Sequence, residues 1–245
     1  MLKILEKKID LSIVLFFLTL ILYVLTRLIG IEKYPIYFFC DEAFHPVNGV
    51  DLLKNGLRDQ NGHLLPMYFS NSYNWNFSLI AYFQMIPNYI FEKSIFAVRF
   101  VSVFFTLLGV IAASYSYKLM YGPKKVWLIV LFFSVSPGWF LHSRTAFEPL
   151  FMVSLFSITF YFYNKYLYEN PKYILVASFF GALTCYSYHA GQVAIGLIGV
   201  FLIGLDFKIH RSNYKFVIGA LALFFFCMLP YIKMRFEHPE YVLDN

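Results

Sequence analysis

Residues 11–29 read LSIVLFFLTLILYVLTRLI, an almost uninterrupted apolar run near the start of the chain. The hydrocarbon core of a bilayer is about 30 Å thick, so a helix needs about 20 mostly apolar residues to cross it. The run follows Lys3, Lys7 and Lys8 but contains no Ala-x-Ala cleavage site. We therefore interpret it as a retained membrane-spanning helix and not as a signal peptide.

The composition of the whole chain points the same way. Hydrophobic residues make up 60% of the sequence and charged residues only 14%, whereas soluble domains carry roughly 25% charged residues. The formal net charge is +6, but the Lys and Arg residues form short clusters between apolar runs and no continuous basic face. They are better explained as orientation signals than as a nucleic-acid site. Three scattered cysteines predict free thiols, without a disulfide framework.

Topology follows from the other apolar runs. These cover 94–117, 126–141, 149–167, 173–188, 192–205 and 214–232. A weaker run at 77–91 is interrupted by Gln84, Pro87 and Asn88. If this run does not cross the membrane, three basic clusters fall on the same side as the basic N-terminus: Lys118, Lys124 and Lys125; Lys165 and Lys172; Lys208, Arg211 and Lys215.

Cytoplasmic loops collect Lys and Arg, and this rule favours the non-crossing interpretation of 77–91. We therefore predict an all-α integral membrane protein of the cell or inner membrane, with about seven spans and a cytoplasmic N-terminus. Residues 1–245 form a single module, and residues 30–93 form a long first outer loop. Loops of this length are usually functional. Within it, apolar Val47, Val50, Leu53 and Leu57 predict an amphipathic helix over 41–57 that lies along the interface.

Candidate site residues lie at the outer ends of the predicted spans. Asp41 and Glu42 are adjacent carboxylates just beyond the first span, where they can also be explained as helix-capping residues. The second outer turn holds His142, Arg144 and Glu148. Charged groups at membrane depth usually face a cavity or a partner. If the helices pack as a bundle, we expect Asp41 and Glu148 to flank one cleft, with Arg144 beside them.

The order of these residues resembles the N-terminal module of the C-type (GT-C) membrane glycosyltransferases, in the group of the protein O-mannosyltransferases and aminoarabinose transferases. The likeness covers roughly residues 10–240 and rests on Asp41-Glu42-Ala43, Gly56, Asp59, Gly62, Leu65-Pro66, Arg99, Ser136-Pro137, Ser143-Arg144, Glu148, Tyr186, Tyr188 and His238-Pro239. It implies seven spans and an outer loop with juxtamembrane helices. It also implies transfer of a sugar from a polyprenyl-phosphate donor to a protein, lipid or glycan acceptor at the outer face. Family members usually continue well past the position that corresponds to Asn245. The resemblance therefore predicts a chain truncated at its C-terminus, and whether this chain is active on its own stays open.

The resemblance also implies roles for single residues. Asp41 matches the catalytic acidic position, Glu42 follows it, and Glu148 occupies a second acidic position where Asp is more common. Arg99 and Arg144 would grip the donor phosphate, although snorkelling at helix ends explains them as well. His142, Tyr186 and Tyr188 would contribute to substrate binding.

A metal site stays open at this stage. His45, His63 and His142 lack metal-ligand spacing, but some family members hold a divalent metal ion between the two acidic loops. Asp41, Glu148 and His142 are the candidate ligands here.

The alternative function is a polytopic transporter or a non-catalytic partner in glycan export. Transporters tend to place charged or helix-breaking residues at mid-membrane. In this chain the mid-span positions are nearly all apolar and the ionisable residues gather at the outer ends. This pattern favours an enzyme.

Overall fold

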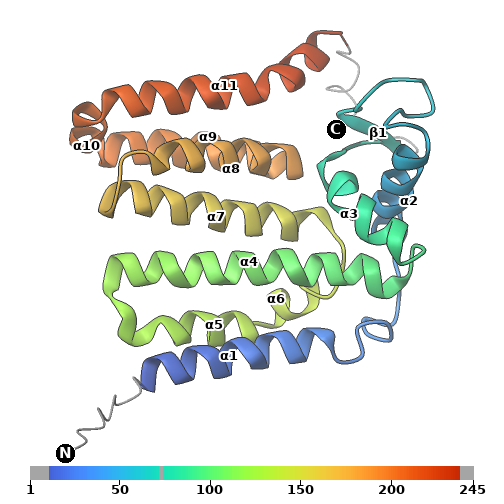
Figure 1. Cartoon of the computed structure of the whole chain (residues 1–245), viewed down its shortest axis with the longest axis horizontal. Helices are drawn as coiled ribbons and strands as arrows, with labels where there is room; N and C mark the ends of the chain where they lie inside the picture. The colour runs from blue at the N-terminus through green and yellow to red at the C-terminus, as the bar shows by residue number, and fades with distance from the viewer. Residues whose placement is uncertain (1–10, 72–73, 238–245) are drawn as a thin grey trace, which may run out of the picture.

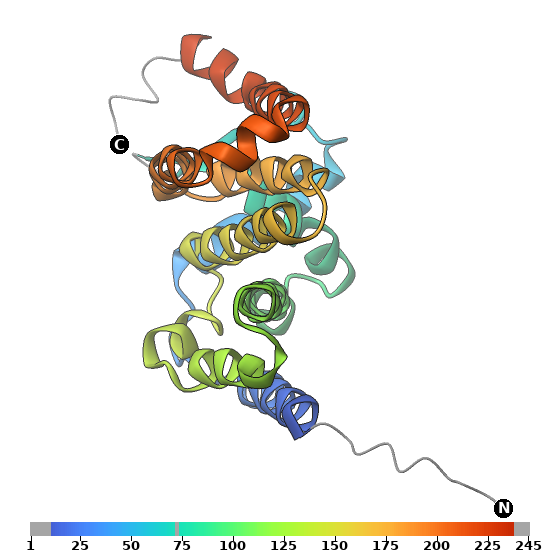
Figure 2. The ribbon, with the colours of Figure 1, turned by 90° about the vertical axis from the view of Figure 1, so that its left-hand side faces the viewer.

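The computed structural model describes residues 11–71 and 74–237, which form a stack of antiparallel helices (Figure 1). The stack runs through neighbouring pairs from α1 to α5, α4, α7 and α8, with α9 and α11 packed on α8. Figure 2 shows these helices nearly end-on, one above another. Their bounds are α1 (Leu11–Leu28), α4 (Ile95–Tyr121), α5 (Val126–Val135), α7 (Glu148–Tyr168), α8 (Tyr173–Ser187), α9 (His189–Leu205) and α11 (Tyr214–Glu237).

The two ends of the stack differ in character. At one end lie α2 (Cys40–Lys54), α3 (Leu79–Ile90) and a hairpin of β1 (Tyr68–Asn71) and β2 (Asn74–Phe77). The other end holds the start of α1 and the connections α4–α5, α7–α8 and α9–α11, which include η1 (Pro123–Lys125) and α10 (Phe207–Ser212). The three basic clusters are on or beside these connections. The structure thus gathers them at one end; the basic start of the chain lies outside the described residues.

Membrane-spanning capacity varies among the helices. Within the described residues, three helices are long and apolar enough to cross a bilayer: Leu11–Leu28, Ile95–Tyr121 and Tyr214–Phe236. The apolar helices α8 and α9 are shorter. Helix α3 has 12 residues, so it is about 18 Å long and falls short of the roughly 30 Å core. The fold is that of a helical membrane protein, and the count of seven spans stays a prediction.

The prediction of one continuous helical span over 126–141 was wrong, because the helix breaks at Pro137. Helix α5 ends at Val135, Ser136 is extended (φ −65°, ψ 116°), and α6 (Pro137–His142) begins anew. A proline disfavours the α conformation in the preceding residue and donates no N–H. The carbonyl that Pro137 would pair with, that of Phe133, instead accepts a 2.7 Å hydrogen bond from Nη2 of Arg27 in α1.

The predicted amphipathic helix exists as α2, but its predicted face was only partly right. Val50 is buried as predicted, whereas Val47 is exposed, and the buried face also contains Glu42, His45, Gly49 and Leu52. A Cβ on Gly49 would lie 2.4 Å from the carbonyl oxygen of Ala81 in α3, so glycine permits the close crossing that sets the rotation of α2.

The β1–β2 hairpin was not predicted. It pairs Tyr68 with Phe77 and Phe69 with Asn76 in antiparallel register. Phe77 and Tyr68 are buried against α8 and α11, so the hairpin packs the segment 30–93 against the last helices of the stack.

Candidate active site

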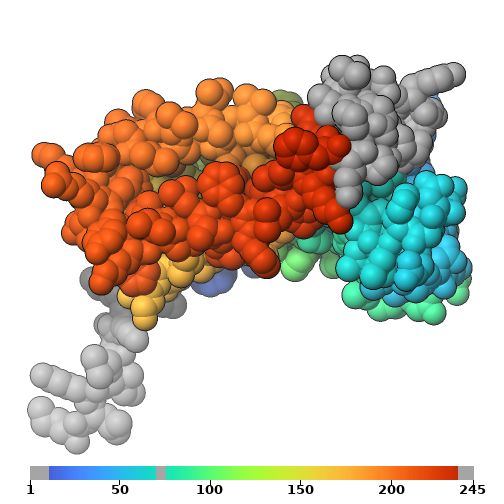
Figure 3. Space-filling model, turned by 90° about the horizontal axis from the view of Figure 1, so that it is seen from above, coloured from blue at the N-terminus to red at the C-terminus, as the bar shows by residue number. Residues whose placement is uncertain are grey.

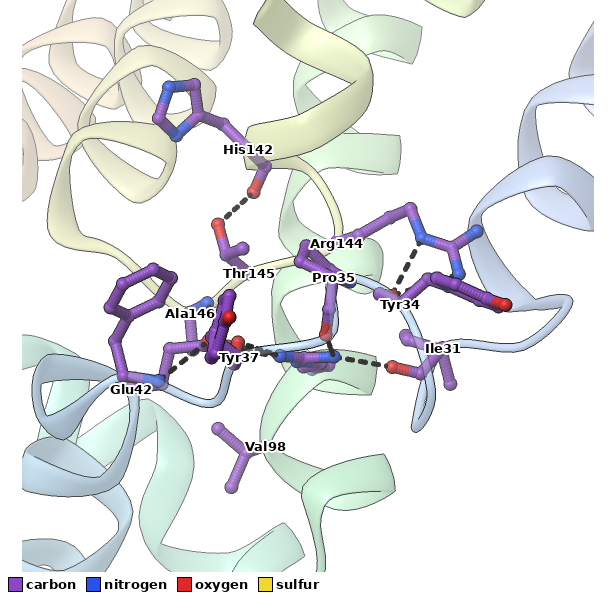
Figure 4. Close-up of polar contacts among 12 residues, drawn as sticks. Ile31, Tyr34, Pro35, Tyr37, Glu42, Val98, His142, Arg144, Thr145 and Ala146 are labelled. Atoms are coloured by element: carbon purple, nitrogen blue, oxygen red, sulfur yellow. Dashed lines mark hydrogen bonds and ion pairs between the residues drawn. The ribbon is translucent and has the colours of Figure 1, made fainter.

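Glu42 lies in the first turn of α2 and is completely buried (0% exposed). Its Oε2 accepts from Nε of Arg99 at 3.0 Å and from the backbone N–H of Ala146 at 3.2 Å. Its Oε1 accepts from Nη2 of Arg99 at 3.2 Å and from the backbone N–H of Phe39 at 3.4 Å. Both oxygens are therefore occupied, and Figure 4 shows Glu42 beside Ala146 in this cluster.

Arg99 enters the same cluster from α4 and is 1% exposed. Its Nη1 donates to the carbonyls of Ile31 and Pro35 at 2.8 and 3.0 Å, and its Nη2 donates to Tyr37 at 3.0 Å. With the two bonds to Glu42, these contacts use all five N–H groups of the guanidinium. Arg99 thus fixes the segment before α2 and holds no N–H in reserve for a donor phosphate.

Arg144 is also engaged with backbone. Nη1 donates to Thr26 at 2.6 Å, Nη2 donates to Ile29 at 2.9 Å, and both Nε and Nη2 donate to Tyr34. Helix C-termini leave carbonyls without partners, and here the side chain satisfies them at the end of α1. Burial, and then the nearby Arg99, lower the pKa of Arg144. The carbonyl groups around the guanidinium stabilise its charged form and so act against this lowering.

Glu148 begins α7 and meets two partners from the segment 30–93. Its Oε1 lies 3.0 Å from Nε2 of the buried His45 and 3.0 Å from Nδ2 of Asn76. Within the described residues, Oε2 has no hydrogen-bond partner, and the side chain is 16% exposed. Two donors on one oxygen fix the orientation of the carboxylate and leave its second oxygen available.

Asp41 differs from its neighbour Glu42 because it is exposed. Within the described residues, the only hydrogen bond of its side chain is one that Oδ1 accepts from Sγ of Cys40 at 3.7 Å. Asp41 and His45 are four positions apart on α2, so they share one face of the helix. Glu148 is thus bonded to His45, and Asp41 lies one helical turn before His45 on α2.

The other sequence candidates are placed as follows. His142 is exposed and packs against Phe147, whose ring contacts Phe39 just before α2. The buried hydroxyl of Tyr186 donates to the carbonyl of Cys227 at 2.7 Å and accepts from N–H of Tyr231 at 3.3 Å, which braces α11 around Pro230. Tyr188 ends α8 in an extended conformation and is half-buried. His238-Pro239 lies outside the described residues.

Sequence reasoning missed two site residues, His45 and Asn76, as partners of Glu148. The four-residue spacing from Asp41 could have pointed to His45, whereas nothing in the sequence pairs Asn76 with a residue 72 positions away. No group of three His, Cys, Asp or Glu side chains close enough to hold a metal ion occurs among the residues described. Asp41, Glu148 and His142 are thus not gathered as a metal site in this structure.

Comparison with known families identifies a family for this chain. The model of the dolichyl-phosphate-mannose-protein mannosyltransferase family matches residues 78–232, more than half of the chain. The matched range includes Arg99, Arg144 and Glu148 but begins after Asp41 and Glu42. No curated protein and no solved structure matches the chain.

Proposed function

From the premise that this chain belongs to the dolichyl-phosphate-mannose-protein mannosyltransferase family, and is thus a membrane glycosyltransferase of the C type, we propose where and how it acts. The family uses sugars linked to polyprenyl phosphate. We propose that this protein transfers a hexose or pentose from such a donor to an acceptor hydroxyl at the extracytoplasmic face.

The side of the membrane is inferred from charge. The basic connections lie at the end of the stack where α1 begins, and the acidic candidates lie at the opposite end. Because cytoplasmic loops collect Lys and Arg, this arrangement supports a cytoplasmic start of α1 and an extracytoplasmic site. The short α3 is in keeping with an outer loop that lies on the membrane without crossing it.

The observation that carries the proposed mechanism is the contrast between Asp41 and Glu42. Both oxygens of Glu42 are held by Arg99 and by backbone N–H groups, whereas Asp41 is exposed. A general base must reach the proton that it removes. Asp41 is therefore the base: it takes the proton of the acceptor hydroxyl while the acceptor oxygen bonds to the anomeric carbon and the bond to the lipid phosphate breaks with its electron pair.

The remaining site residues act by position or by contact with the substrates. Glu148 presents Oε2 to a substrate hydroxyl while His45 and Asn76 hold Oε1. Arg99 and Arg144 keep the segment before α2, the end of α1 and the turn before α7 together. His142, exposed beside Phe147, lies where it can contact a substrate that reaches Asp41.

An apolar groove suits the lipid part of the donor. A cavity of about 490 Å³ lies between α7, α8, α9 and α11, within the usual range of roughly 300–1,000 Å³ for ligand sites. It extends from Gln192 and Tyr231 near one end of the helices to Tyr163 and His210 near the other. An isoprenoid chain that lies there would run parallel to the helices, with its phosphate toward the outer end.

The experiment supplies purified protein in lipid nanodiscs with radiolabelled polyprenyl-phosphate mannose or with the matching sugar nucleotide. The proposal expects label to leave the lipid donor and none to leave the nucleotide. Direct use of the nucleotide would contradict it. In liposomes, movement of lipid-linked sugar between leaflets without any transfer would favour the transporter alternative instead.

A further inference from the structure

A second cavity lies between the predicted outer loop and the end of α11. It has a volume of about 500 Å³ and is bounded by the C-terminal half of α2, residues 58–69 and the end of α11 around Pro230 and Lys233. Figure 3 shows the first outer loop, in cyan, beside the end of α11, in red. We refer to this cavity as the outer-loop pocket.

The outer-loop pocket is aligned with Asp41. Asn48 in α2 and Asn55, the residue that follows α2, line it and lie seven and fourteen positions after Asp41. At 3.6 residues per turn, positions seven apart return to almost the same side of a helix, and they are separated by about 10 Å along its axis. Asp41, Asn48 and Asn55 thus form one stripe that leads from the candidate base into the pocket.

The polar lining of the pocket includes a set of neutral amide groups. Four side-chain amides line it, from Asn48, Asn55, Gln60 and Asn61. An amide both donates and accepts hydrogen bonds, as a sugar hydroxyl does. Such a lining complements a neutral polyhydroxylated ligand.

The lining also contains Asp51, Arg58, Asp59 and Lys233, two acidic and two basic side chains whose formal charges balance. Both backbone N–H groups of Asn61 and His63 donate to Oδ1 of Asp59, at 2.9 and 2.8 Å. Nη1 of Arg58 donates to the carbonyl of Gly62 at 2.7 Å, and Asp51 pairs with Lys93 at 3.4 Å. These contacts shape the loop, and because the formal charges of the lining balance, no net charge favours an ionic ligand of either sign.

The floor of the pocket is apolar. Leu52 and Phe69 are buried beneath it. A sugar ring carries polar hydroxyls at its edge and apolar C–H groups on its faces, which matches an amide rim over an apolar floor. A peptide, which can be held by main-chain pairing along a strand, is the competing occupant.

We propose that the outer-loop pocket binds the acceptor and that the acceptor is a neutral carbohydrate chain, whose terminal hydroxyl reaches Asp41. This inference rests on the proposed function, since it names the substrate class of the same reaction. Asn48 and Asn55 are specificity-determining residues, and Asp41 is not needed to bind the acceptor.

The test measures binding by saturation-transfer NMR on the whole protein in detergent, with neutral disaccharides and a Ser/Thr-containing peptide as probes and no donor present. We expect disaccharide binding that weakens about tenfold in the double variant Asn48→Leu/Asn55→Leu, the loss expected for one or two hydrogen bonds. Lys54→Gln, exposed on another face of α2 and outside the pocket, should bind as the parent does.

Asp41→Asn separates this proposal from the proposed function, because it should lose sugar transfer and keep disaccharide binding. Absence of disaccharide binding, or the same disaccharide affinity in the parent and the double variant, would overturn the pocket proposal. Either result would leave the transferase assignment standing. Binding of the peptide with displacement of the disaccharide would overturn the carbohydrate class. Normal disaccharide binding with full transfer by Asp41→Asn would instead refute the base and spare the pocket.

Discussion

Replacing Glu42 by Gln changes one atom of the most buried ion pair at the site. Each carboxylate oxygen accepts one bond from Arg99 and one from a backbone N–H. In Gln one of these oxygens becomes an NH₂ group, which donates and cannot accept. Whichever way the amide turns, two N–H donors lose their acceptor, and Arg99 loses its counter-charge in a site that is 1% exposed.

The magnitude follows from these losses. One lost bond involves a charged donor, worth about 1.5–3 kcal/mol, and the other is neutral, worth about 0.5–1.5 kcal/mol. Breaking a buried ion pair by removing one partner typically costs about 3–5 kcal/mol. For a chain of this size, such a loss lowers the melting temperature by about 6–20 °C.

The assay is thermal unfolding of the purified protein in detergent, followed by tryptophan fluorescence. Asp41→Asn is the matched control, because it makes the same chemical change one residue away on an exposed side chain and should change the stability by less than about 0.5 kcal/mol. The double variant Glu42→Gln/Arg99→Gln should lose less than the sum of its single variants, with coupling of about 1–3 kcal/mol. If Glu42→Gln melts with the control, Glu42 and Arg99 do not form the buried pair described above.

Three further predictions address other parts of the account. Arg144→Lys loses the fork that binds three carbonyls, so it should lower stability by about 1–3 kcal/mol in the same assay and leave the KM for the donor unchanged. A raised KM at normal stability would mean that Arg144 binds the donor phosphate. His45→Leu removes one donor to Glu148 and should lower kcat about tenfold, with recovery in His45→Gln, so full activity of His45→Leu would remove His45 from the site. A cysteine introduced at Gly122 should be shielded from an impermeant thiol reagent in intact cells while one at Asn61 is labelled, and labelling at Gly122 would reverse the orientation.

The sequence was sufficient to predict the long helices, because continuous apolar runs are a strong signal. The runs at 11–29, 149–167 and 173–188 correspond closely to α1, α7 and α8. The break at Pro137 could have been predicted from the proline itself, but the apolar run 126–141 continues through it. The β1–β2 hairpin was not predicted, because its short strands depend on packing of Tyr68 and Phe77 against distant helices.

The candidate site, too, was only partly predictable from the sequence. The sequence placed Asp41, Glu42 and Glu148 in outer loops, but it could not tell which of the adjacent carboxylates is free. That choice depends on the rotation of α2, which is set by Arg99, 57 positions further on, and by the crossing of Gly49 over α3. Likewise, nothing local shows that the guanidinium groups of Arg99 and Arg144 are used by backbone carbonyls. Long-range contacts of this kind require the structure.

The central claim is that Asp41, and not Glu42, is the catalytic base. The most direct measurement is the rate of sugar transfer from a polyprenyl-phosphate donor by Asp41→Asn, at matched expression and with the melting temperature of the parent. The account predicts a rate lower by about two to four orders of magnitude, as expected for loss of a positioned base. Transfer by Asp41→Asn at the parent rate would contradict it.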